Sequence, residues 1–469
     1  MLLVCVVSFF VLVWHSRSFG VSLGLPVAYL FSTLFQYLPG AFGHLVRGNF
    51  FDDSNTTQLG LRLTTIGVVS FVAGVVLAQR IMRGAVDRSD TRWLHQVGTM
   101  RFAEYCLWGG WLLLFVGIPL GRIPSVGAAI NRGGLIWVLG VLIGLLVSIR
   151  QGRSGKIFLW LAALSVYPLA GLIFGGFLSL GSTSVFVVFS AWLMILKSHI
   201  RAYTVVVVFF LVCLLGFLSY YKHREEIRSD VWEGGTLEKR AVSSIKIVTD
   251  IAWFDPNNPE QLTALDDRLN QCKFVGMAAW NIASGEHVFL HGRSVWEGLQ
   301  ALVPRMLWPD KPVFSGGSKL FTELTGFMTS EYTSYGVGQV MELYVSYGVP
   351  SLVVGFLLFG FAYGWIDRNT AAALSRGEFG LALMWFLPGV AINAPLASIA
   401  EETGNMAAAV VAAYGWRYAW GAYYANTPTK RRGKQLAGIT KQTDGVVPAE
   451  SKQESGKRAR LGRNFLRHG

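Results

Sequence analysis

The chain has 469 residues, of which 52% are hydrophobic and only 15% are charged. A soluble domain carries about 25% charged residues, so this composition indicates a membrane protein. The apolar residues fall in long runs without alternation, for example over 205–218, which excludes a membrane β-barrel. The net charge of +13 does not indicate a nucleic-acid partner, because eleven Lys or Arg lie in the C-terminal stretch 425–469. That stretch is expected to be a disordered cytoplasmic tail that contacts anionic lipid, with a dedicated binding tail as the alternative.

The apolar runs predict the spans. A helix needs about 20 apolar residues to cross the hydrocarbon layer. The runs that meet or approach this length are 2–14, 21–38, 61–77, 105–120, 133–149, 157–174, 183–196, 205–220, 339–366, 381–397 and 406–420. The sequence therefore predicts an all-α, polytopic helical membrane protein with about eleven transmembrane helices.

Loop charge predicts the orientation, because Lys and Arg concentrate in cytoplasmic loops. With eleven spans, alternate loops carry the basic residues: Arg80, Arg83, Arg88, Arg92, Arg101, Arg150, Arg153, Lys156, Lys197, Arg201, Arg368 and Arg376. The opposite short loops carry Arg47, Arg62, Arg122 and Arg132. This pattern places the C-terminus in the cytoplasm and the N-terminus outside.

One long polar segment separates two groups of spans. The predicted organisation is N-terminal transmembrane helices over 1–220, a periplasmic loop region over 221–335, C-terminal transmembrane helices over 336–424 and the basic tail over 425–469. Within the loop region, 222–281 is expected to form helical pieces broken at Gly234-Gly235 and at 256–259. A loop this long is uncommon without a function.

The stretch 302–312, LVPRMLWPDKP, is a candidate phosphate site. Its three prolines stiffen the backbone, so Arg305 and Lys311 are held beside Trp308. Arginine binds phosphate through two parallel hydrogen bonds and lysine binds it as a point charge. A rigid turn at the membrane surface explains the same pattern equally well.

The stretch 331–348 is a candidate sugar and acid–base site. Tyr332, Tyr335, Tyr344 and Tyr347 flank Glu342, which is expected one turn inside the 339–366 span. An ionisable residue in a transmembrane helix is costly and is a functional candidate. The alternative is an interfacial carboxylate in water, with the tyrosines in a membrane belt.

Two motifs then carry a resemblance. They are Pro-Arg-x-Leu-Trp-Pro-x-Lys-Pro at 304–312 and Gly-x-x-x-Glu-x-Tyr-x-x-x-Gly at 338–348. The region 293–364 that contains them resembles the C-terminal part of bacterial oligosaccharide repeat-unit polymerases, the O-antigen polymerase family. Elsewhere only the hydropathy layout is similar. Related ligases carry a histidine near the position of Glu342, which favours a polymerase over a ligase.

The resemblance implies a metal-independent glycosyltransferase of the bacterial inner membrane. It would join undecaprenyl-pyrophosphate-linked repeat units at the periplasmic face, without a cofactor, and a chain-length regulator is an expected partner. The alternatives are an O-antigen ligase-type transferase and a transporter or flippase for lipid-linked oligosaccharide. The predicted catalytic residues are Glu342, Arg305 and Lys311. The predicted substrate-binding residues are Arg293, Trp308, Tyr332, Tyr335 and Tyr344.

Other polar groups are assigned no chemistry. Asp266-Asp267 is interpreted as a solvated helix face. His287 and His291 lack a Glu at the spacing of a zinc protease, so no metal site is expected.

Overall fold

The computed structural model describes residues 1–18, 22–46, 54–82, 97–120, 126–176, 178–196, 198–303, 307–308, 310–312, 317–327 and 335–425. Within these ranges the regular secondary structure is helical and contains no strand, which confirms the all-α prediction. The chain divides into two compact units, Met1–Trp416 and Arg417–Gly469.

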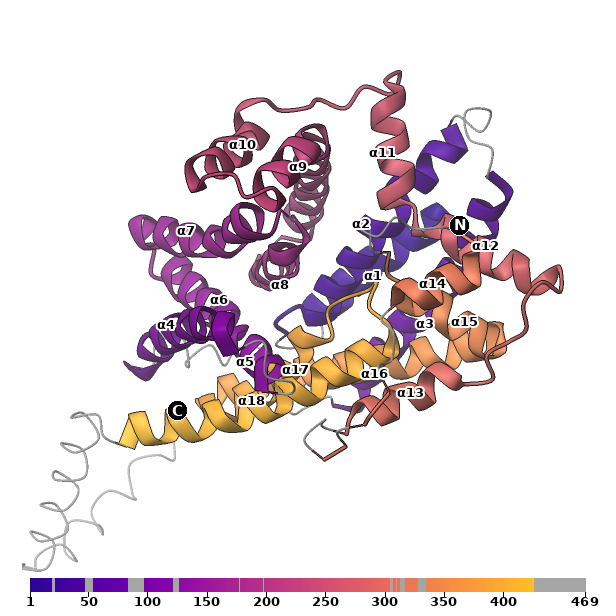
Figure 1. Ribbon diagram of the computed structural model, residues 1–469. Coiled ribbons are helices and arrows are strands. Elements are labelled where there is room, and N and C mark those ends of the chain that lie inside the picture. Colours follow the sequence, from indigo (N-terminus) through magenta and orange to yellow (C-terminus); the bar gives the residue numbers. More distant parts are fainter. Residues whose placement is uncertain are drawn as a thin grey trace, which may run out of the picture. The chain divides into compact units, whose positions relative to one another are not determined.

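Figure 1 shows the helices in chain order. They are α1 (Leu2–Ser18), α2 (Leu25–Val46), α3 (Ser54–Ile81), α4 (Val97–Leu120), α5 (Val126–Gly134), α6 (Ile136–Arg150), α7 (Ser154–Ala170), the π-helical turn η2 (Gly171–Gly175), α8 (Ser179–Ile195), α9 (His199–Trp232), α10 (Leu237–Thr249), α11 (Pro259–Leu269), α12 (Gln271–Ala283), α13 (Arg293–Ala301), α14 (Gly317–Thr325), α15 (Gly338–Tyr347), α16 (Val349–Ser375), α17 (Phe379–Ala391) and α18 (Ile399–Ala425).

Several helices are long and apolar enough to cross a membrane, as expected of a multi-pass membrane protein. Among the described residues there are five: Ser54–Ile81, Val126–Arg150, Ser154–Gly175, His199–Trp232 and Val349–Ser375. Three shorter apolar helices accompany them: Leu2–Ser18, Gly181–Ile195 and Phe379–Ala391.

The expected helix breaks in 222–281 are confirmed. α9 ends at Trp232 before the two glycines, and α11 begins at Pro259. The Asn258 side chain caps α11 by accepting hydrogen bonds from the backbone N–H groups of Glu260 and Gln261. These breaks are determined by turn and capping residues close by in the sequence, so they can be predicted from the sequence alone.

The expected single span over 339–366 is wrong, because the helix is interrupted at Gly348. This residue has φ 73° and ψ −148°, a conformation that glycine adopts readily and other residues rarely do. Pro350 follows in the first turn of α16, where its missing N–H costs nothing. Glu342 therefore lies in α15, outside the candidate span formed by α16.

Helix α3 packs closely against α16 through two glycines. A Cβ atom added at Gly74 would lie 2.1 Å from the Leu357 carbonyl oxygen, and one added at Gly360 would lie 2.1 Å from the Phe71 carbonyl oxygen. The two backbones are thus in direct contact, as is common where small residues line membrane-helix interfaces.

The first turns of α3 pack in the same way against α12. A Cβ atom at Gly60 would lie 1.8 Å from the Cys272 carbonyl oxygen, and one at Gly276 would lie 1.7 Å from the Thr56 carbonyl oxygen. Cys272 and Phe274 are buried. The segment expected as a periplasmic loop region therefore includes a helix that packs tightly onto a candidate span.

Polar contacts join the ends of helices that are distant in the sequence. His15 Nδ1 lies 2.6 Å from Gln79 Oε1, which links α1 to the end of α3. The Leu25 N–H donates to Asp367 Oδ1 over 3.1 Å, which links the start of α2 to α16.

A second set of polar contacts joins other ends of helices that are distant in the sequence. His44 Nε2 lies 2.6 Å from Asp266 Oδ1, which links α2 to α11. The Thr183 hydroxyl donates to the Asn393 carbonyl over 3.4 Å, which links α8 to the segment after α17.

The glycine contact between α3 and α12 generates a prediction. We expect Gly276→Ala to lower stability by about 1–3 kcal/mol or more, because the added methyl group meets a backbone carbonyl that cannot move aside. Thermal unfolding of the purified protein in detergent measures the effect. The control is Gly216→Ala in α9, where a Cβ atom meets nothing within 4 Å. This control should be neutral or stabilising, and equal melting temperatures for the two variants would contradict the packing argument.

Candidate functional site

Glu342 is buried where three helices meet. It lies in α15 with 1% of its surface exposed, and its Oε2 accepts a 2.7 Å hydrogen bond from the backbone N–H of Ile399 at the start of α18. The Thr403 hydroxyl in α18 donates to the Gly298 carbonyl of α13 over 2.9 Å. The carboxylate therefore sits at the junction of α13, α15 and the N-terminal end of α18.

A capping box starts α18 at the same place. The Glu401 N–H donates to Ser398 Oγ, and the Ser398 N–H donates to Glu401 Oε2, each over 3.2 Å. This reciprocal pair satisfies two of the backbone donors at the helix start. Glu342 satisfies the Ile399 donor from a different helix, and its negative charge there suits the positive end of the helix dipole.

The environment of Glu342 changes its acidity. Burial raises the pKa of this carboxyl to about 7, hydrogen bonds from the Ile399 N–H and Ser294 oppose the rise, and the charges of Glu297 and Glu401 add to it. A carboxyl group with a pKa near neutral pH exchanges its proton under physiological conditions. It is thus suited to general acid–base catalysis.

Helix α13 brings Arg293 near this junction but holds it at the surface. Its Nε donates to Glu297 Oε1 over 2.9 Å, and 59% of its side chain is exposed. The next residue, Ser294, is buried, and its hydroxyl lies 3.5 Å from that of Ser346 at the end of α15. Arg293 therefore flanks the junction on the solvent side.

Lys311 and Trp308 belong to the turn that follows α13. The Lys311 ammonium donates to the carbonyls of Ala301 and Val303 over 2.9 and 2.8 Å, and its backbone N–H donates to the Trp308 carbonyl over 3.1 Å. Lys311 thus caps the C-terminal end of α13, where a positive charge is favourable. Trp308 is half-buried. Arg305 and Tyr332 lie outside the described residues.

Two of the tyrosines predicted to bind substrate are described, and they have different neighbours. Tyr335 is buried and stacks on Phe321 with the ring centroids 5.1 Å apart, and the Arg268 guanidinium lies 4.7 Å from its ring centroid. Tyr344 is half-buried and meets Phe289 edge-on at 6.3 Å. Tyr335 is a core residue here, and its contact with sugar stays a prediction.

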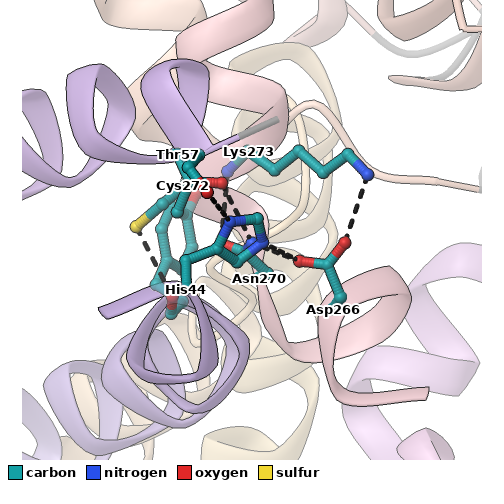
Figure 2. Close-up of polar contacts among 8 residues, drawn as sticks. His44, Thr57, Asp266, Asn270, Cys272 and Lys273 are labelled. Carbon is teal, nitrogen blue, oxygen red and sulfur yellow. Dashed lines mark hydrogen bonds and ion pairs between the residues drawn. The ribbon is translucent and has the colours of Figure 1, made fainter. Parts of the chain in front are cut away.

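A second polar cluster was missed by the sequence interpretation. Asp266 is only 5% exposed, so its assignment to a solvated helix face is wrong. Figure 2 shows its carboxylate between His44 and the Lys273 ammonium. Oδ1 accepts from His44 Nε2 and Asn270 Nδ2, each at 2.6 Å, and Oδ2 lies 3.2 Å from Lys273 Nζ. The Asn270 amide also donates to Thr57 Oγ1 over 3.2 Å.

These contacts keep Asp266 ionised. Burial by itself would raise the pKa of the carboxyl, but hydrogen bonds from His44 and Asn270 and the charge of Lys273 together lower it below the usual value. The cluster joins α2 and α3 to α11 and α12. A sequence signal existed, because Asp266 shares the helical face of Leu262, Leu265 and Leu269, all of which are buried.

The cluster generates a stability prediction. Asp266→Ala should cost about 3–5 kcal/mol, because it removes the carboxylate that the buried His44 and the partly buried Lys273 share. Asp267→Ala removes a neighbouring, less buried carboxylate and should cost far less. Since the folded pKa is lowered, the contribution of Asp266 is present above about pH 4 and is lost as pH falls through the folded value. Melting temperatures of both variants measured against pH test this, and equal losses would contradict it.

Within the described ranges, no group of three or more His, Cys, Asp or Glu side chains is arranged to hold a metal ion. The comparisons with known proteins give one match. A family model described as "Domain of unknown function (DUF8712)" matches residues 42–386, a region that includes His44, Asp266 and Glu342. No curated protein and no solved structure matches the chain. Because the matched region is well over half of its length, the chain belongs to the DUF8712 family.

Proposed function

We propose that this protein is a membrane glycosyltransferase that polymerises undecaprenyl-pyrophosphate-linked oligosaccharide repeat units at the periplasmic face of a bacterial inner membrane. The observation that carries the proposal is Glu342, a buried carboxyl with a pKa near 7 at the junction of α13, α15 and α18. The motif resemblance at 304–312 and 338–348 supplies the substrate class.

In the proposed reaction a sugar hydroxyl of one lipid-linked unit attacks C1 of the growing chain. The hydroxyl proton passes to Glu342, and the bond between C1 and the pyrophosphate oxygen breaks, with its electron pair leaving on the pyrophosphate. Negative charge grows on that leaving group, so cations fixed nearby accelerate the reaction. Arg305 and Lys311 are the proposed cations, and Arg293 is a more exposed third.

Two interrupted stretches of helix favour a second candidate function, a transporter or flippase for lipid-linked oligosaccharide. α15 and α16 are separated at Gly348, and residues 392–398 separate α17 from α18. Transporters bind substrates and ions at such interruptions. The two candidates differ in where lipid-linked single repeats collect when the protein fails. Loss of a polymerase leaves them at the outer face, and loss of a flippase leaves them at the inner face.

We also propose the eleven-span topology with a cytoplasmic C-terminus. Its support is the way polar contacts pair helix ends. In the alternation predicted from loop charge, His15, Gln79, Leu25 and Asp367 all fall at cytoplasmic ends. The other set of contacts joins ends that the same alternation assigns to the periplasm: His44, Asp266, Thr183 and Asn393.

The topology is tested with a reporter that is active only in the periplasm. Inserted at the exposed turn near Asn258, it should be active, and fused after Ser451 it should be inactive at equal protein level. Activity at both positions, or at neither, would refute the proposed arrangement.

The catalytic role is tested with Glu342→Gln. The amide keeps an oxygen acceptor for the Ile399 N–H but cannot accept the proton, so polymerisation should fall about 10²–10⁴-fold. Lipid-linked single repeats should accumulate at the outer face, where a membrane-impermeant glycosidase releases their sugars. The measurement is the size distribution of extracted lipid-linked glycans.

Two comparisons complete this test. Glu378→Gln changes an exposed carboxylate and should leave the glycan ladder unchanged. Glu342→Ala also removes the acceptor for Ile399, so only this variant should lower the melting temperature strongly. A normal ladder from Glu342→Gln would exclude Glu342 from catalysis and leave Glu331, outside the described residues, as the next carboxylate to test. Single repeats that stay protected from the glycosidase would favour the flippase.

A further inference from the structure

The deeply buried polar side chains that have atoms without hydrogen-bond partners among the described residues include three from the C-terminal helices and the segment between them. They are Glu402 in α18, Tyr363 in α16 and Asn393 between α17 and α18, with 5%, 0% and 1% of their surfaces exposed. The unpartnered atoms are Glu402 Oε1, the Tyr363 hydroxyl and both polar atoms of the Asn393 amide. Buried polar groups are nearly always paired, so such a concentration requires an explanation.

These groups belong to one polar region. The Glu402 carboxylate is within electrostatic range of the hydroxyls of Tyr363 and Tyr29, and the rings of these tyrosines lie 5.0 Å apart. The Tyr29 hydroxyl donates to Gln339 Oε1 over 3.1 Å. The Gln339 amide in turn donates to the carbonyl of Ala394, the residue after Asn393, over 3.0 Å. Neighbouring side chains from α2, α15, α16 and α18 are thus linked in one polar region, and Gln339 connects it to the segment after α17.

That segment has no regular helix. α17 ends at Ala391, shortly after Pro388, and α18 begins at Ile399. An interruption between apolar helices is tolerated where it is buried in protein, and its backbone carbonyls then become available as ligands. The carbonyls of Ala394 and Ala397 each accept one hydrogen bond from Gln339. The Ala394 carbonyl also accepts from the Ala397 N–H over 2.9 Å. A carbonyl oxygen has two lone pairs, so the Ala397 carbonyl retains the capacity for a second contact.

The donor set indicates the class of ligand. A carboxylate, an amide oxygen and a phenolic hydroxyl are all hard oxygen donors, which suit alkali and alkaline-earth cations and suit soft metals poorly. Only the Glu402 carboxylate among these three donors carries a formal charge, so one positive charge balances it, and the nearby carboxylates of Glu342 and Glu401 add to the attraction for a cation. A divalent ion would bring a second positive charge into the interior, at a large solvation cost.

We propose that Glu402, Asn393 and Tyr363 form a buried binding site for a monovalent cation such as Na⁺. The cation pairs with the carboxylate, accepts the lone pairs of the Asn393 and Tyr363 oxygens, and ties the segment between α17 and α18 to α16. This site lies beyond the proposed glycan chemistry, and its test does not depend on catalytic activity.

The test is thermal unfolding of the purified full-length protein in detergent. NaCl is titrated against N-methyl-D-glucamine chloride at constant ionic strength and pH. A ligand that binds the folded state raises the melting temperature in a saturable way. We expect such a rise with Na⁺ in the unaltered protein. Glu402→Gln should raise the half-saturating Na⁺ concentration by about tenfold or more, since a contact with a charged group is worth at least that factor.

Two further variants keep the test decisive. Glu378→Gln alters an exposed carboxylate outside the site and should leave the dependence of the melting temperature on Na⁺ unchanged. If Glu402→Gln does not fold, Tyr363→Phe removes one hydroxyl only and should weaken the Na⁺ response in a folded protein. Equal melting temperatures in the two salts, or a Na⁺ response that persists in Glu402→Gln and Tyr363→Phe, would overturn the proposal. A stabilisation that follows pH but not Na⁺ would also overturn it, because a proton would then balance Glu402.

Discussion

Direct backbone contact along α3 is the constraint on which the other features depend. Glycines at four places bring α3 against α12 at one end and against α16 further along, with no side chain between the backbones. α16 follows α15, which carries Glu342, and α12 follows α11, which carries Asp266. The positions of both polar clusters are therefore fixed by packing at van der Waals distance, which leaves little freedom for sliding or tilting.

The charges around the predicted site also stabilise helix ends. Glu342 accepts the first backbone donor of α18, and Lys311 donates to the last carbonyls of α13. A carboxylate at a helix start and an ammonium at a helix end are the favourable placements in the field of the backbone dipoles. The same side chains thus stabilise helix ends and are proposed to take part in the chemistry. A variant that loses activity therefore reports on catalysis only if it keeps the hydrogen bond between the side chain and the helix end.

The sequence predicted what local chemistry determines. The breaks at Gly234 and at Pro259 and the helical class were correct, because turn residues, caps and apolar run length decide them. The break at Gly348 was missed, because apolar residues continue on both sides and one glycine in such a run is compatible with an unbroken helix. Glu342 was singled out by its apolar surroundings, but its partner Ile399 follows more than a whole span later.

Contacts between residues that are distant in the sequence explain the remaining differences between the sequence predictions and the structure. Asp266 looked solvated because its partner His44 lies 222 residues earlier in the sequence, on another helix. Tyr335 looked available to a ligand because Phe321 and Arg268, which surround its ring, come from separate helices. The apolar periodicity of α11 indicates that Asp266 is buried but does not specify its partners, and both arrangements arise only when separate helices assemble.

The contact between Gly60 and Gly276 has a consequence for biosynthesis. Chains are made from the N-terminus, so α3 is synthesised and can insert long before α12 exists. Throughout that interval the glycine face at the start of α3 has no neighbour from α12. The His44 imidazole likewise cannot yet contact the Asp266 carboxylate. The N-terminal helices can therefore reach their final arrangement only after the ribosome has passed residue 276, which makes closure of this part of the bundle a late event in the life of the nascent chain.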